Sequence, residues 1–486
     1  MADPNVIPSR RAARGACPLV LLAILLAGCV VGPDFQRPAA GLPDHWRTTA
    51  AVANEPTAPS GQAWWRTFGD PVLDNLENRA IASNLDVAAA RERIVAAKAT
   101  LGQARAQGAP EIGGQAGYSR ERTSTAGVLP ITRSLLGLNP ASGRDVHAVG
   151  FDLYSLGAAA SWELDLWSGQ ARRNEGAVAS LEAARAESAG ALLSVQAEVA
   201  RAYFQLRGLQ AERSVAQQSL ALAVEATRLR EALRDRGLAA EADLVDAHAK
   251  ARALRSDLAG LDQDLAALAR GLSVLAGGDP GADPFDLSAP APRARLEAAP
   301  ARMPSEMARH RPDIVAAEAR LHAATAAVGA AQADFYPQVS LTGRLSLDVL
   351  NLRDLGWDGR DTSLGPSISI PIFSGGRLEK TLELRRSEQA SAALAYRQAV
   401  IGAWREVEDA LSASRTLEMR RPDVEEDLAA RQVQVARLEQ RRARGDIGLG
   451  PVLAARADAL AAEGAAARHR TAQFLARIQL RRALGG

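Results

Sequence analysis

The chain has 486 residues, and its 58 basic and 56 acidic side chains leave a formal net charge of +2. This balance gives no indication of nucleic acid or of a strongly acidic partner. Beyond one short apolar run near the N-terminus, no stretch approaches the roughly 18 apolar residues of a transmembrane helix, so strands would have to make any membrane crossing.

The first 28 residues predict an export signal. Basic residues precede a short apolar run over residues 18–27, which ends in Leu26-Ala27-Gly28-Cys29. This layout is typical of a secretory signal peptide, and its end resembles a bacterial lipobox. The resemblance implies that Cys29 is lipidated and that Val30 after it directs the protein to the outer membrane. An ordinary signal peptide cut near Gly28 is the alternative. The only other cysteine, Cys17, leaves with the signal, so the mature chain can form no disulfide.

Residues 29–68 are rich in proline, alanine and glycine and show no periodicity, so we expect a lipid-anchored N-terminal tether. It ends in a Trp64-Trp65 pair, which is most simply a packing anchor. Asp70 followed by Pro71 then predicts the start of a helix.

Alternating residues predict strands in two places. From Val339 to Val349 every second residue is apolar or glycine and the residues between are polar, so this strand has one apolar and one polar face. We expect its partner strand at residues 367–373, with Ile368, Ile370 and Ile372 on one side. An isolated hairpin of this kind is only marginally stable in water, so it requires a partner or a different solvent.

An earlier hairpin has the same pattern, which predicts a tandem repeat. Asp86 and Pro110 correspond to Asp313 and Pro337, and a second set corresponds to the three isoleucines: Trp162, Leu164 and Leu166. We expect each repeat to run helix, hairpin, long helix, tip and helix. Repeat one covers residues 69–283, with its hairpin at about 110–168 and its tip at about 234–246. A proline-rich equatorial linker covers 284–303. Repeat two covers 304–486, with its hairpin at about 336–374 and its tip at about 442–455.

The long helices carry coiled-coil spacing. Apolar residues step by three and four along the first one: Leu192, Val195, Val199, Ala202, Leu206 and Leu209. Pro422 should kink or interrupt its counterpart in repeat two. Both helices end in a basic last turn followed by Gly237 or Gly445, which is a C-cap signal. The fold class is therefore mainly α, with long coiled-coil helices and two β-hairpins.

No pattern for catalysis, cofactor or metal binding is found. The six histidines show no HExxH or paired spacing, and no serine lies in a GxSxG motif. Asp70, Asp243 and Asp246 are explained more simply as helix caps or solvated side chains than as metal ligands. We expect a protein that is not an enzyme and that holds no cofactor.

Several motifs together resemble the TolC/OprM-type outer-membrane factors, in particular the NodT-like lipoprotein branch of RND efflux systems. They are Cys29-Val-Val-Gly-Pro-Asp-Phe-Gln-Arg-Pro38, the Trp64-to-Leu73 block, Arg311-Pro-Asp-Ile314 and Phe335-Tyr-Pro337. The resemblance implies a homotrimer, in which four strands per protomer close a transmembrane β-barrel and the helices form a periplasmic tunnel. It also implies a passive exit duct that works with a periplasmic adaptor and an inner-membrane RND pump.

The same resemblance implies roles for the two tips. The adaptor contacts would be Arg236, Gly237, Leu238, Arg444, Gly445 and Asp446. The acidic residues of a periplasmic gate would be Asp243, Asp246 and Asp446. Repeat two departs from the family pattern, because Pro451 and Ala454 stand where repeat one has these aspartates. The alternative for these carboxylates is that they cap helices or keep the tips soluble.

Two other functions stay open at this point. The same fold serves as the exit duct of type I protein secretion, and a non-channel periplasmic coiled-coil lipoprotein is a third possibility, which the two-faced strands disfavour. The sequence does not identify the substrate.

Overall fold

The structure is a computed structural model. It describes residues 30–39, 41–43, 46–47, 63–124, 148–286, 294, 307 and 309–486. The predicted signal peptide, Cys29 and most of the linker therefore lie outside the described residues. None of the described helices is long and apolar enough to cross a membrane.

The chain forms two compact units, each assembled from segments of both halves. The sheet unit combines residues 98–179 and 322–391 with the N-terminal residues up to Gln36, and the helical unit contains the rest. The predicted division into two repeats stays a prediction.

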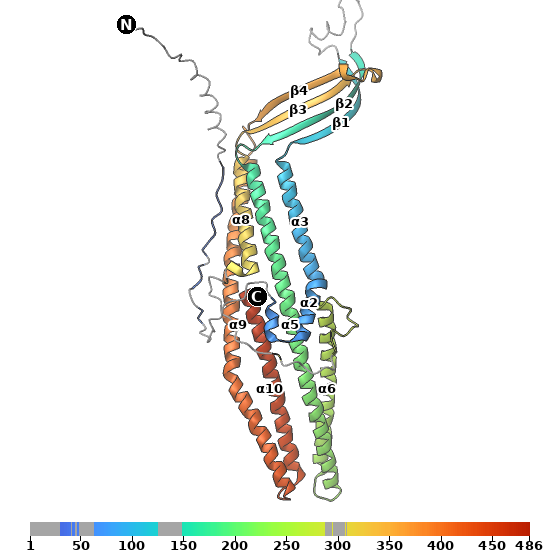
Figure 1. The fold of residues 1–486 in the computed structure, drawn as a ribbon, viewed down its shortest axis with the longest axis vertical. Helices are drawn as coiled ribbons and strands as arrows, with labels where there is room; N and C mark the ends of the chain where they lie inside the picture. Colours follow the sequence, from blue (N-terminus) through green and yellow to red (C-terminus); the bar gives the residue numbers. More distant parts are fainter. Residues whose placement is uncertain are drawn as a thin grey trace, which may run out of the picture. The chain divides into compact units, whose positions relative to one another are not determined.

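One antiparallel sheet with the strand order β1-β2-β3-β4 lies in the sheet unit (Figure 1). Its strands are β1 (Glu111–Ser124), β2 (Ala148–Leu164), β3 (Gln338–Val349) and β4 (Arg360–Ser369). The helices are η1 (Trp64–Phe68), α2 (Pro71–Ser83), α3 (Leu85–Gln107), α5 (Gly169–Arg234), α6 (Glu241–Leu275), α8 (Pro312–Ala333), α9 (Arg377–Ala443) and α10 (Leu449–Leu484). Long helices with four antiparallel strands confirm the predicted fold class.

Three local expectations need correction. Strand β4 begins at Arg360, before the predicted residue 367, and ends at Ser369, so Ile370 and Ile372 follow the strand instead of belonging to it. Pro371 has no N–H to donate to a sheet, which accounts for this end. Strand β2 likewise ends before Leu166, because the Asp165 carboxylate already accepts hydrogen bonds from the backbone N–H groups of Gln170 and Ala171 at the start of α5. Of the two effects predicted for Pro422, an interruption is wrong, because α9 continues through it as one helix, and a kink stays a prediction.

The helical unit has an aromatic core. The first turn of α2 is capped by Asp70, whose carboxylate accepts from the N–H groups of Val72 and Leu73. Its other oxygen accepts a buried hydrogen bond of 2.6 Å from the Tyr203 hydroxyl on α5. Around this pair the core packs the side chains of Trp64, Trp65, Phe68, Leu73, Leu76, Phe204, Leu272, Phe474 and Ile478. The tryptophan pair is therefore a packing anchor.

Candidate functional site

The sheet has one apolar and one polar face. Directly opposed residues of an antiparallel pair share a face, and the register sets Val339 opposite Leu164 on β2 and Ile368 on β4. The apolar face contains Ile112, Ala116, Tyr118, Tyr154, Leu156, Trp162, Leu341, Leu345, Leu347 and Leu364. The other face contains mostly small and polar side chains, among them Gln115, Ser119, Ser155, Ser340, Thr342, Arg344, Ser367 and Asp361.

The apolar face is uncovered in the protomer. Leu364 is 79% exposed and Ile112 is 75% exposed. Strands β1 and β4 form the two edges of the sheet, and each pairs on one side only among the described strands. A single copy thus presents apolar side chains and unpaired backbone groups to its surroundings.

Both helix tips are built by the same backbone motif. In the first tip the N–H of Gly237 donates to the Arg234 carbonyl, and the N–H of Leu238 donates to the Leu233 carbonyl. In the second tip Gly445 and Asp446 donate in the same way to Arg442 and Arg441. These pairs define Schellman motifs, whose left-handed residue suits glycine; φ is +73° at Gly237 and +84° at Gly445. The tips lie at the same end of the helical unit (Figure 1).

The predicted adaptor-contact residues all lie at these tips and are exposed. Leu238 is an apolar side chain with 71% exposure, and Asp446 takes its place in the second motif. Both glycines follow a basic last helical turn, and Arg236 and Arg444 directly precede them.

The three predicted gate aspartates differ in their surroundings. Asp243 accepts a hydrogen bond from the N–H of Ala240 and lies 3.8 Å from the Arg230 guanidinium, so it acts as a helix cap. Asp246 and Asp446 are exposed, and their carboxylates contact no polar group among the described residues.

The two helices of each tip are joined by ion pairs. Arg234 on α5 lies 3.6 Å from Glu241 on α6. In the second tip Arg456 on α10 lies 2.7 Å from Glu439 on α9, and Arg431 lies 3.7 Å from Asp458. Each partner is at least 39% exposed, so solvent screens these pairs and each contributes little to the stability of its hairpin.

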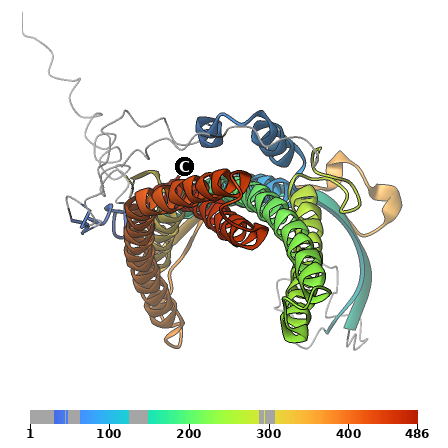
Figure 2. The same ribbon diagram turned by 90° about the horizontal axis from the view of Figure 1, so that it is seen from below.

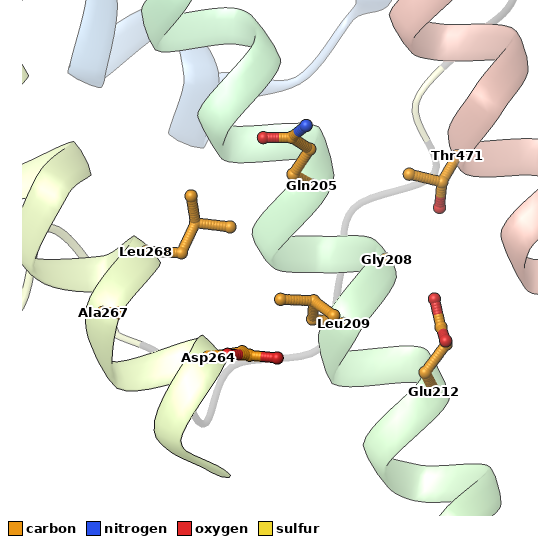
Figure 3. A pocket seen from close by; sticks show the side chains of 8 residues that line it. All are labelled: Gln205, Gly208, Leu209, Glu212, Asp264, Ala267, Leu268 and Thr471. Carbon is orange, nitrogen blue, oxygen red and sulfur yellow. The ribbon is translucent and has the colours of Figure 1, made fainter. Parts of the chain in front are cut away.

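A groove of about 570 Å³ lies between α5, α6 and α10 (Figure 3). Leu209 and Leu268 line it together with the carboxylates of Glu212 and Asp264. Gly208 permits the close approach of α10, because a Cβ there would lie 2.5 Å from the Thr471 hydroxyl oxygen. The groove contains no nucleophile–base arrangement, and no cluster of metal-ligating side chains occurs among the described residues.

The sequence did not reveal a binding site for the N-terminal segment at the start of α5. The Arg172 side chain is only 6% exposed, and its guanidinium donates to the Val31 and Gly32 carbonyls and to the Asp34 carboxylate at 2.6 Å. Arg172 also pairs with Glu175, which contacts His322 of α8 at 2.8 Å. Burial disfavours the charged form of Glu175, but hydrogen bonds from Arg172 and His322 hold its pKa below the usual range.

Two further contacts complete this site, which we call the strap clamp. The ring of Phe35 stacks on His322 with centroids 4.4 Å apart. Gly32 has φ of +99°, and a Cβ there would lie 2.3 Å from the Cα of Gly329. Only a glycine fits this crossing of the segment over α8. Exposed arginines and histidines are common, so their spacing alone carried no signal for this site.

The chain matches the model of the outer membrane efflux protein family over residues 76–278 and 303–486. It is 29% identical over 468 residues to the pyoverdine export outer membrane protein OpmQ of Pseudomonas aeruginosa, with 96% of each chain covered. It is 31% identical over 407 residues to the outer membrane protein OprJ of the same species, with 82% of this chain and 80% of OprJ covered. The solved outer-membrane channel OprN superposes with a TM-score of 0.82 at 30% identity, covering 94% of this chain and 99% of OprN. The chain therefore belongs to the outer membrane efflux protein family, and it is an outer-membrane channel of an efflux pump, not an enzyme.

Proposed function

We propose that this channel is the exit duct of a tripartite RND-type efflux pump. Three copies form the duct, a periplasmic adaptor joins it to an inner-membrane RND pump, and Cys29 is its lipid anchor. Substrate passes through by passive conduction, because the described residues offer no catalytic or nucleotide-binding set.

The observation that carries the proposal is a two-faced sheet with two unpaired edges. Unpaired N–H and C=O groups cost several kcal/mol each in hydrocarbon, so an open four-stranded sheet cannot lie in a bilayer. Pairing β4 of one copy with β1 of the next removes the edges. Three copies supply roughly twelve strands, which lies within the range of outer-membrane barrels. The apolar face then meets lipid and the polar face lines a wet lumen.

The helices also support assembly. Helix α9 exposes Leu394, Ile401, Met419 and Val433. The first two are one heptad apart and the last two are two heptads apart, which is the spacing of a coiled-coil seam. An exposed seam of this kind is typical of a surface that packs against another protein surface, here a neighbouring copy.

The strap clamp supports a lipid anchor at Cys29. The Val31 carbonyl accepts a hydrogen bond from the Arg172 side chain. Arg172 lies three residues after the start of α5 and eight residues after the end of β2. Cys29 precedes Val31 by only two residues in the sequence. An acyl chain on Cys29 would thus enter the membrane beside the end of the sheet.

We assign adaptor contact to the tips, at Arg236, Gly237, Leu238, Arg444, Gly445 and Asp446. Asp246 and Asp446 are the stronger gate candidates, since Asp243 already caps a helix and faces Arg230. Three copies would bring these carboxylates into rings at the periplasmic entrance.

The names of the relatives suggest the cargo. One relative exports pyoverdine, and the Pseudomonas putida protein TtgC belongs to a toluene efflux pump. We propose that this channel likewise conducts small organic molecules. Type I protein secretion remains the alternative.

Native mass spectrometry of the purified, lipidated protein in detergent tests the assembly, and planar-bilayer recording tests conduction. We expect a trimer, an acylated N-terminal peptide and discrete channel openings. A soluble monomer without conductance would overturn the proposal. Susceptibility of a deletion strain to solvents and antibiotics, set against its secretion of proteins, separates efflux from type I secretion.

A further inference from the structure

The connection between β3 and β4 exposes apolar side chains on a backbone that has regular turns. Residues 350–359 contain Leu350, Leu352, Leu355 and Trp357, which are between 39% and 69% exposed. Two 3-10 turns, η3 (Leu352–Asp354) and η4 (Trp357–Gly359), fix the backbone. A hydrogen bond of 3.1 Å from Asn351 to Asp354 and another from Arg360 to the Trp357 carbonyl fasten these turns. The connection therefore presents its apolar side chains on an ordered frame.

This connection folds onto the apolar side of the sheet. Val349 lies opposite Tyr154, and Tyr154 lies opposite Tyr118, so all three share the apolar face. Val349 is nevertheless only 7% exposed. Gly359 covers it closely, since a Cβ at Gly359 would lie 2.7 Å from Cγ1 of Val349. Figure 2 shows the connection beyond the convex side of the curved strands. It does not lie over the polar face, where a plug of the lumen would have to lie.

The neighbouring side chains are those of a membrane boundary. The Tyr118 and Tyr154 rings lie 5.0 Å apart on the same face and at the same end of the sheet as Val349. Tyrosine and tryptophan are enriched where hydrocarbon gives way to polar headgroups. Arg353 has an 84% exposed side chain and only a 3.9 Å contact to Asp354, so it is available to phosphate-bearing headgroups at the polar rim.

We propose that the β3–β4 connection is a membrane-interface clip that inserts Trp357 and its three leucines among the acyl chains of the outer leaflet. The inference rests on the proposed function in that the apolar face must meet lipid. The occupant is lipid because the clip continues the lipid-facing surface on the same side of the sheet. Charge contributes less than apolar insertion, since the clip carries two aspartates and one arginine.

Spin labelling tests the inference on the full-length, lipidated channel reconstituted in liposomes. The mature chain has no cysteine except Cys29, which acylation blocks, so single cysteines can be labelled selectively. Three variants suffice: Trp357→Cys in the clip, Asp358→Cys beside it as the matched control, and Leu364→Cys on the apolar face of β4. The measured quantity is the ratio of accessibility to oxygen, which concentrates in lipid, over accessibility to a water-soluble nickel chelate. Conductance of each labelled variant verifies assembly.

We expect the ratio at position 357 to be several-fold higher than at position 358 and close to that at position 364. A lipid-like ratio at 364 with a water-like ratio at 357 would overturn the clip and leave the channel proposal intact. Protection of 357 from both reagents would mean that another copy covers it, which also overturns the clip. A water-like ratio at both 357 and 364 would instead refute the proposed orientation of the sheet.

Discussion

The substitution Glu77→Gln tests how the protonation of a buried carboxyl group in the helical unit affects folding stability. Glu77 lies on α2 and is fully buried, and neither carboxylate oxygen has a hydrogen-bond partner in the part of the chain that the structure describes. Burial, with a smaller effect of the charge on Asp74, raises the pKa of Glu77 from 4.5 to about 9. Glu77 is therefore protonated in the folded protein at neutral pH.

The size of the resulting change in folding stability follows from the different numbers of protons that the folded and unfolded states bind. The folded state retains a proton that the unfolded state loses above pH 4.5, so stability falls as the pH rises from about 4.5 to 9 and then levels off. The slope is at most ~1.4 kcal/mol per pH unit, and between pH 6 and 8 the loss is about 3 kcal/mol. Glutamine has nearly the same shape and no proton to lose, so the variant lacks this slope.

Hydrogen exchange at α2, followed by mass spectrometry of peptides within residues 71–83, measures the effect. Comparing wild type and Glu77→Gln at the same pH cancels the intrinsic pH dependence of exchange. The ratio of their opening constants should change about tenfold per pH unit between pH 6 and 8, with wild type opening more as the pH rises.

Glu92→Gln is the matched control, since Glu92 is exposed on α3 and should leave the ratio constant. A constant ratio for Glu77→Gln as well would refute the reasoning. It would mean that Glu77 is ionised in the assembled protein and paired with a group that the single chain does not supply.

Three further predictions concern the tips, the strap and the core. Alanine at Asp246 and Asp446 should raise single-channel conductance and lower cation selectivity, whereas Asp423→Ala on the exposed surface of α9 should change neither; unchanged recordings for the tip variants would exclude them as gate residues. Gly32→Ala should release residues 31–35 from the strap clamp and speed their hydrogen exchange, because a Cβ clashes with Gly329, while Gly41→Ala, also at positive φ but with open space around it, should not. Tyr203→Phe should cost about 2 kcal/mol by leaving an oxygen of the buried Asp70 unpaired; thermal unfolding measures this loss, and Tyr336→Phe, at a half-exposed ring, should lower the melting temperature far less.

The sequence was most informative where one periodicity extends over many residues. Alternation from Val339 to Val349 predicted strand β3 and its two faces, and three-four spacing predicted the long helices. It was less informative at the ends of strands, because local hydrogen bonds and prolines there determine which residue is the last of the strand. Pro371 ends β4 earlier than the isoleucine alternation suggested, and Asp165 turns the chain into α5 before Leu166 can join β2.

The strap clamp was beyond prediction for a different reason. Its parts come from three distant segments, and each part is ordinary by itself. Composition predicted a lipid-anchored tether without periodicity, but Arg172 holds residues 31–34 through the Asp34 carboxylate and two backbone carbonyls, in addition to its pair with Glu175. A proline- and alanine-rich segment is thus held in place by side chains of α5 and α8, which lie far from it in the sequence.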